Sequence, residues 1–195
     1  MAEVKNILLV GVGGQGIILA SKILSTGLIE AGYDVKMSEV HGMAQRGGSV
    51  TTQVRYGEKV HSPIIGQGEA DILVSFEEME AMRWIDHLKP EGKLVINNYR
   101  IPSVPILIGE KTYPTGIKEA LSDKIDTVVV EAMEVAEKIG NSKTQNIVML
   151  GALVGALKLD EVNWEQVIGE LVKPKFVEIN VKAFNEGKAL AEKLF

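Results

Sequence analysis

Apolar and polar positions in the first forty residues predict a strand, a helix and a second strand. Residues 6–10 form an essentially apolar run that ends at a glycine, which is typical of a strand buried on both faces. Apolar residues then recur at helical spacing from Ile17 to Ala31, and Gly32 is a natural stop for that helix. Residues 35–40 favour another strand. The unit has the length of a parallel crossover connection.

The pattern then changes to alternation, which indicates a hairpin after the second strand. Apolar or β-branched residues alternate with polar ones from Val50 to Tyr56, residues 57–58 can turn the chain, and residues 59–62 can return. Because a hairpin pairs antiparallel strands, we expect a mixed sheet.

Later segments complete an α/β pattern. Apolar, β-branched runs predict three more strands, at residues 71–76, 93–97 and 127–130. We expect a helix at residues 77–88, stopped by residues 90–92, and a long connection at residues 100–116 with at most one short strand. From Glu131 onward the spacing is helical, at residues 132–139, 145–157, 164–172 and 177–194.

These elements predict a single domain over residues 1–195. Its expected class is α/β, with a Rossmann-like, mixed, mainly parallel sheet flanked by helices, a β-hairpin after the second strand and a helical C-terminal third.

Composition narrows the classes of function. The net charge of −5 and the scattered lysines and arginines argue against a nucleic-acid binder. The absence of cysteine excludes disulfides, thiolate-bound iron–sulfur clusters and cysteine-based zinc sites. The first residues lack the layout of a signal peptide, and the longest apolar stretch, near residues 147–157, is too short and glycine-rich to span a bilayer. We therefore expect a cytoplasmic protein that does not bind membranes.

A glycine-rich loop is the first candidate site. Gly11-Val12-Gly13-Gly14-Gln15-Gly16 stands between an expected strand and an expected helix. Glycines permit a tight turn and a close approach of the backbone to a ligand, and a helix N-terminus attracts phosphate. The loop is therefore a candidate for binding a coenzyme through Gly11, Gly13, Gly14, Gln15 and Gly16, although a turn that only packs has the same composition.

A polar loop after the second expected strand is the second candidate. Its candidate residues for an active-site or partner-facing loop are Glu39, His41, Gln45, Arg46, Gly47 and Gly48. Arg46 could pair with a carboxylate or phosphate, and His41 could transfer a proton. Glu39 ends a strand where a ribose-binding acid lies in dinucleotide folds, but a solvated acid is the simpler interpretation.

Two further features have structural interpretations beside the functional ones. Asn146 could anchor the expected helix at residues 145–157 near the glycine loop, or simply start that helix. Glu77, Glu78 and Glu80 crowd an expected helix start, where carboxylates suit the helix dipole better than they suggest a catalytic pair. No metal-ligand spacing appears in the sequence.

Four motifs, taken in order, resemble the gamma domain or subunit of the 2-oxoacid:ferredoxin oxidoreductases. They are the glycine loop, residues 39–48, Ser62-Pro63, and the segment at residues 144–151. Many members carry a Tyr-Gly version of the second motif. This chain instead has His41-Gly42 ahead of Arg46-Gly47-Gly48, which is similar to the beta subunit of indolepyruvate oxidoreductases.

The resemblance implies chemistry that is divided between subunits. In such enzymes thiamine diphosphate, held through Mg²⁺, attacks the 2-oxoacid, iron–sulfur clusters pass electrons to ferredoxin, and coenzyme A receives the acyl group. This chain has no cysteine and no Gly-Asp-Gly segment of the kind that anchors thiamine diphosphate. A larger partner subunit is therefore expected to carry those cofactors. The roles left to this chain are assembly, closure of the active site and binding of the coenzyme A phosphates at the glycine loop.

Other readings remain open at this point. A self-standing nicotinamide- or flavin-dependent Rossmann enzyme would use the glycine loop and Glu39. The early hairpin argues against it, since a dinucleotide fold runs another helix there. A gamma subunit of a 2-oxoglutarate- or pyruvate-type enzyme, or a scaffold without any ligand, would also fit the motifs.

Overall fold

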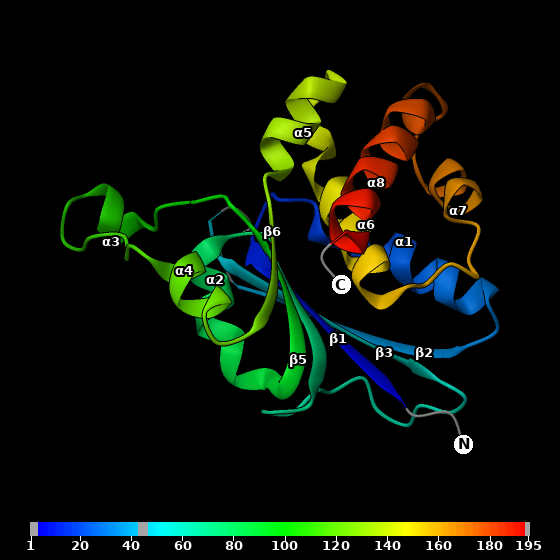
Figure 1. The fold of residues 1–195 in the computed structure, drawn as a ribbon, viewed down its shortest axis with the longest axis horizontal. Helices are drawn as coiled ribbons and strands as arrows, with labels where there is room; N and C mark the ends of the chain where they lie inside the picture. Colours follow the sequence, from blue (N-terminus) through cyan, green and yellow to red (C-terminus); the bar gives the residue numbers. More distant parts are fainter. Residues whose placement is uncertain (1–3, 43–46, 194–195) are drawn as a thin grey trace.

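The computed structural model describes residues 4–42 and 47–193, and it shows a six-stranded sheet with helices on both faces (Figure 1). The strands are β1 (Lys5–Val12), β2 (Asp34–His41), β3 (Ser49–Gly57), β4 (Ala70–Ser75), β5 (Leu88–Asn97) and β6 (Asp126–Val130). Their order in the sheet is β2-β3-β1-β4-β5-β6. Only β3 runs antiparallel to its neighbours, so the other strands of this sheet share one direction.

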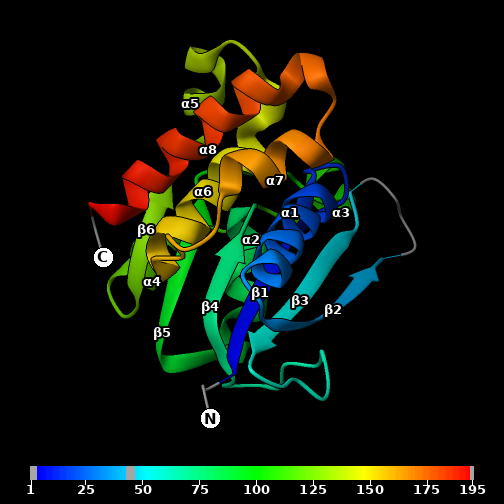
Figure 2. The same cartoon turned by 90° about the vertical axis from the view of Figure 1, so that its right-hand side faces the viewer.

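Helices of very different length cover the two faces of the sheet. The helices are α1 (Ile17–Glu30), α2 (Glu78–Trp84), α3 (Val104–Leu107), α4 (Ile117–Ser122), α5 (Ala132–Ile139), α6 (Gln145–Leu157), α7 (Trp164–Leu171) and α8 (Val177–Glu192), with short 3₁₀ turns η1 (Ile85–His87), η2 (Ser142–Thr144) and η3 (Pro174–Phe176). Figure 2 shows α1, α6, α7 and α8 stacked on one face, with α2 behind the sheet on the other. The larger core therefore lies under the C-terminal helices, as the helical C-terminal third predicts.

The central strand β1 explains why the first apolar run is continuous. Ile7 and Leu9 point into the core beneath the C-terminal helices, whereas Leu8 and Val10 point into a second core beneath α2. All four side chains are completely buried. A strand that is covered on both faces needs apolar residues at every position, so the prediction of a doubly buried strand is confirmed.

Three glycines let α6 and α8 pack with their backbones in contact. A Cβ atom added at Gly151 would lie 2.0 Å from the carbonyl oxygen of Phe184, and one at Gly187 would lie 2.0 Å from that of Val148. At Gly155 the corresponding distance, to the carbonyl oxygen of Lys188, is 2.6 Å. Each distance is far below a normal carbon–oxygen contact, so these positions accept no side chain without moving a helix.

The predicted return strand at residues 59–62 is wrong, although the alternating strand before it is confirmed as β3. The hairpin instead joins β2 to β3, and the other edge of β3 pairs with β1 from Ser49 to Tyr56. Because both edges of β3 are already occupied, by β2 and by β1, the segment after Gly57 has no free edge of β3 to pair with.

Two other boundaries differ from expectation. The strand β5 begins at Leu88, not at Lys93, and includes the prolyl segment expected to separate it from a helix. Its pairing with β4 shifts register between Leu88 and Lys93, so Pro90 stands where the ladder is irregular and its missing N–H is tolerated. The long connection at residues 100–116 contains one short helix, α3, in place of a short strand, and a second short helix, α4, begins directly after it.

Among the described helices, none combines the length and the hydropathy needed to cross a membrane.

Candidate functional site

The glycine loop lies at the carboxyl end of β1, beside the carboxyl end of β4. The connection from β1 leads through α1 toward β2 on one side, whereas β4, β5 and β6 lie on the other side. Crevices at such a reversal of strand order are the usual ligand sites of open α/β sheets. The sheet therefore places the loop where a ligand would be expected.

Backbone geometry makes the loop suitable for an anion. Gly16 is the N-cap of α1 with φ 78°, and Gly14 has φ 101° with open space where a Cβ would stand. The first turn of α1, residues 17–20, contains only apolar residues, so no carboxylate occupies the helix start. A helix N-terminus leaves backbone N–H groups unpaired and carries partial positive charge, which favours a phosphate.

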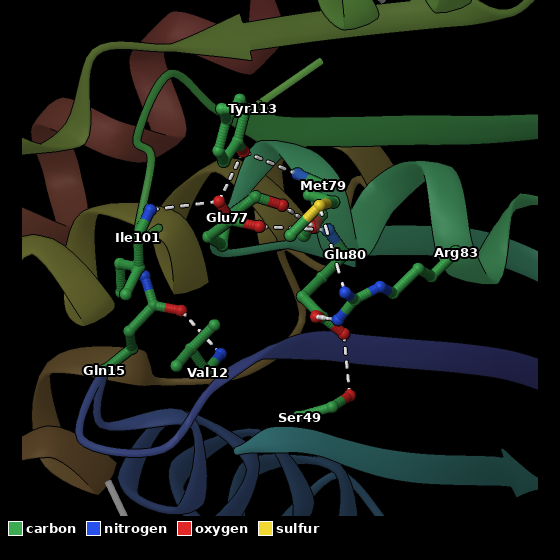
Figure 3. Close-up of polar contacts among 10 residues, drawn as sticks. Val12, Gln15, Ser49, Glu77, Met79, Glu80, Arg83, Ile101 and Tyr113 are labelled. Carbon is green, nitrogen blue, oxygen red and sulfur yellow. Dashed lines mark hydrogen bonds and ion pairs between the residues drawn. The ribbon is translucent and has the colours of Figure 1, made fainter. Parts of the chain in front are cut away.

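Gln15 has an internal role in the loop. Gln15 is 7% exposed, and its Oε1 accepts a hydrogen bond from the Val12 N–H (2.7 Å; Figure 3). Its Nε2 donates to the Phe76 carbonyl (2.6 Å). A Cβ at Gly11 would lie 2.7 Å from the same Oε1, so Gly11 leaves the space that this side chain needs. Gln15 thus fixes the loop to the end of β4 and turns away from a ligand above the loop.

Asn146 lies against the glycine loop, which is one of the two interpretations that the sequence left open. Its Nδ2 donates to the Gly16 carbonyl (3.1 Å), and a Cβ at Gly16 would lie 2.6 Å from that nitrogen. Asn146 is the second residue of α6, so the starts of α1 and α6 are joined here. Position 16 therefore requires glycine for two reasons: its φ is positive, and Asn146 fills the space where a Cβ would stand.

The ends of the second candidate loop reach the glycine loop. The Gly13 N–H donates to the Gly48 carbonyl (2.9 Å), and the Gly42 N–H donates to the Ser49 carbonyl (3.1 Å). Both motifs that the sequence analysis singled out therefore meet at one edge of the sheet. Gln45, Arg46 and the side chain of His41 lie outside the described part of the structure, and Gly47, with φ 82°, precedes the contact.

Glu39 does not join this site. In a dinucleotide fold the ribose-binding acid ends the strand beside β1. Here β3 separates β1 from β2, and the Glu39 carboxylate accepts a hydrogen bond from Ser21 Oγ on α1 (3.2 Å). The interpretation of Glu39 as a ribose ligand therefore loses its geometric support.

The sequence analysis placed three carboxylates at one helix start but did not predict that they are buried beside the loop. Glu77, Glu78 and Glu80, at the start of α2, are at most 1% exposed. Glu77 caps α2 through the Glu80 N–H (3.0 Å), accepts from the Ile101 N–H (3.0 Å), and accepts from the Tyr113 hydroxyl (Figure 3). The signal in the sequence was their position directly after a doubly buried strand, where a helix-start carboxylate has no access to water.

The other two carboxylates also bind neighbouring segments. Glu78 accepts from Arg100 Nε (3.0 Å) and lies 3.7 Å from Lys118 Nζ. Glu80 accepts from Ser49 Oγ (2.7 Å), at the end of the second loop, and pairs with Arg83. The cluster therefore fixes both the second loop and residues 98–116, a segment that we call the arm.

The hydroxyl of Tyr113 gives a testable pH dependence. It donates to Glu77 and accepts from the Met79 N–H (3.0 Å). Burial, followed by the hydrogen bond to Glu77, raises the pKa of Tyr113 above its usual 10.0. A raised folded-state pKa stabilises the fold fully below the unfolded value, and this contribution is lost as the pH rises from about 10 toward the higher value.

We expect Tyr113→Phe to lower the free energy of unfolding by about 1–2 kcal/mol at pH 7, because the Met79 N–H loses its partner. Urea denaturation from pH 7 to pH 11 should show a difference between variant and wild type that shrinks above pH 10. A difference that stays constant over that range would contradict this assignment of the hydroxyl.

The groups that converge at the glycine loop have the chemistry that favours an anion. Backbone N–H groups and a helix start converge at the glycine loop, whereas the carboxylates nearby are each paired with chain residues. Among residues 4–42 and 47–193, no group of three or more histidine, aspartate and glutamate residues is arranged to hold a metal ion.

Comparisons with known sequences point to one family. Residues 6–190 match the family described as pyruvate ferredoxin/flavodoxin oxidoreductase. The indolepyruvate oxidoreductase subunit IorB of Thermococcus kodakarensis is 39% identical over 197 residues, which span 97% of this chain and 96% of that protein. The two chains are therefore similar from end to end.

Solved structures share the fold. The gamma subunit of the keto/oxoacid ferredoxin oxidoreductase from Geobacter sulfurreducens is 25% identical, with a TM-score of 0.70 over 97% of this chain and 99% of that chain. A chain of the 2-oxoglutarate:ferredoxin oxidoreductase from Magnetococcus marinus is 22% identical, with a TM-score of 0.72 over 99% of this chain but only 32% of that one. The same fold thus occurs both as a separate chain and as about a third of a longer one.

Proposed function

Because the chain belongs to the pyruvate ferredoxin/flavodoxin oxidoreductase family, we propose that it is the small subunit of a 2-oxoacid:ferredoxin oxidoreductase that acts on indolepyruvate or a related aryl-pyruvate. The observation that supports this function best is the end-to-end similarity to the IorB subunit. The complex would decarboxylate the 2-oxoacid oxidatively in the cytoplasm and form an acyl-coenzyme A.

The residues of this chain do not fit the redox cofactors of such a complex. It has no cysteine to ligate an iron–sulfur cluster and no Gly-Asp-Gly segment for thiamine diphosphate with Mg²⁺. We assign these cofactors, and the contact with ferredoxin, to a larger partner subunit. Selection of the 2-oxoacid side chain would fall mainly to that subunit as well.

We assign the phosphate end of coenzyme A to the glycine loop of this chain. The assignment is supported by Gly14 and Gly16 in left-handed backbone conformations, by the apolar first turn of α1, and by the position at the reversal of strand order. Here Gly11, Gln15 and Asn146 shape the loop, while the backbone at Gly13, Gly14 and Gly16 approaches the phosphate.

The second loop would face the active site or the partner. Its ends are fixed by the glycine loop and by Glu80, so a ligand at Gly13–Gly14 would lie beside it. In this arrangement Arg46 could pair with a phosphate or carboxylate, and His41 could donate a hydrogen bond or carry a proton.

Ile18 offers a sharp test of the phosphate assignment. It lies in the first turn of α1 and is 51% exposed. Ile18→Asp should favour the helix start yet repel an anion, because a carboxylate would occupy the positive end of the helix dipole. We expect the KM for coenzyme A of the assembled enzyme to rise at least about tenfold, which is about 1.4 kcal/mol.

The matched control is Ile18→Asn, which has nearly the same shape without the charge. It should change the KM for coenzyme A much less than Ile18→Asp does, and both variants should assemble normally. Equal KM values for the two variants would show that the coenzyme A phosphates do not bind at this loop.

A further inference from the structure

The middle of the arm is an uncharged, apolar stretch that projects from the rest of the molecule. Residues 101–109 contain no charged side chain, and Figure 1 shows α3 at the far end of the molecule, away from the C-terminal helices. Val104 is 68% exposed, Leu107 69% and Ile108 63%. We call these three residues the arm surface.

The arm surface is one continuous face. Residues at i, i+3 and i+4 lie on the same side of a helical turn, and Val104, Leu107 and Ile108 have this spacing. The helix α3 has no buried residue, so residues 4–42 and 47–193 supply no cover for that face. Exposed apolar clusters of this kind usually mark a site of interaction.

Buried carboxylates hold the arm in place. Glu77 binds the Ile101 N–H on one side of α3 and the Tyr113 hydroxyl on the other, as Figure 3 shows. Glu78 binds Arg100 Nε at the base. Buried carboxyl groups are costly unless they are paired, so these contacts oppose displacement of the arm from its position. The apolar face is thereby presented in a fixed orientation.

We infer that the arm surface docks into an uncharged, apolar groove of the larger partner subunit, an inference that rests on the proposed function. The longer Magnetococcus marinus chain, of which this fold covers 32%, indicates that the same fold can be built beside additional polypeptide. In a separate small chain, the counterpart of that additional polypeptide would be another subunit, bound through a surface of the small chain. Depletion of charge at the centre, as in residues 101–109, is the composition of an interface core.

The test measures assembly of the full chain with the co-expressed larger subunit. Leu107→Glu should raise the Kd for the larger subunit at least tenfold, because a carboxylate would enter an apolar groove. Leu107→Met keeps an apolar side chain of similar volume and should bind like wild type. Ile29→Glu is the matched control, since Ile29 is 58% exposed on α1, and it should retain wild-type affinity and thermal stability.

Each outcome has a defined meaning. If wild type binds the larger subunit and Leu107→Glu binds equally well, the arm surface is not the docking site, while the proposed function stands. If wild type itself fails to bind, the proposed function fails and this inference fails with it. Sedimentation of the isolated chain is the third measurement. A concentration-dependent dimer that Leu107→Glu abolishes would assign the arm surface to a second copy of this chain and overturn the inference.

Discussion

Gly187→Ala is expected to destabilise the protein by about 3 kcal/mol, although alanine is the better helix former. The added methyl would lie 2.0 Å from the Val148 carbonyl oxygen, which belongs to the backbone of α6 and cannot rotate away. The helices α6 and α8 would have to separate, and the buried side chains between them would lose contact. For a chain of this size the melting temperature should fall by about 6–12 °C.

The control for this substitution is Gly169→Ala, on α7. There the nearest atom to an added Cβ is Val177 Cγ1 at 3.8 Å, an ordinary contact. Gly169→Ala should therefore be neutral or stabilising by up to about 1 kcal/mol. Thermal denaturation of the two variants separates close packing from helix propensity. Equal melting temperatures for Gly187→Ala and wild type would show that α6 and α8 are not in backbone contact.

The second large effect concerns activity, which should be absent from this chain alone and present in the assembled complex. The chemistry of a 2-oxoacid oxidation needs an electron acceptor and a carbanion-stabilising cofactor. A chain without cysteine and without a thiamine-anchoring segment provides neither binding site. The contribution that we propose for it is the glycine loop, whose helix start would bind a phosphate group and supply no electrons.

The local parts of the fold were predictable from the sequence. The bounds of α5 and α6 agree with the helical spacing at residues 132–139 and 145–157, because both helices are set by apolar residues at short range. The contact of Asn146 with the glycine loop was one of the two interpretations that the sequence left open. The pairing of β3 with β1 was not predicted, because it joins residues that are 37 positions apart at Val12 and Ser49 and 51 apart at Lys5 and Tyr56, and it leaves no local pattern.

The candidate site was predictable only in part. The glycine loop and its place after a buried strand followed from composition and spacing, whereas the inward orientation of Gln15 depends on Phe76, which is distant in sequence. The sequence indicated that Glu77, Glu78 and Glu80 stand at a helix start, but it gave no prediction of their burial. Their burial follows from the arm, which folds back over them through contacts that include Ile101 and Tyr113.

Viologen reduction with indolepyruvate and coenzyme A, measured for each subunit alone and for the two mixed, tests the central claim most directly. The account predicts that the purified small chain is colourless and inactive, and that mixing it with the larger, cluster-containing subunit produces the full rate. Dye reduction by the small chain alone, or a rate of the larger subunit that the small chain leaves unchanged, would contradict the account.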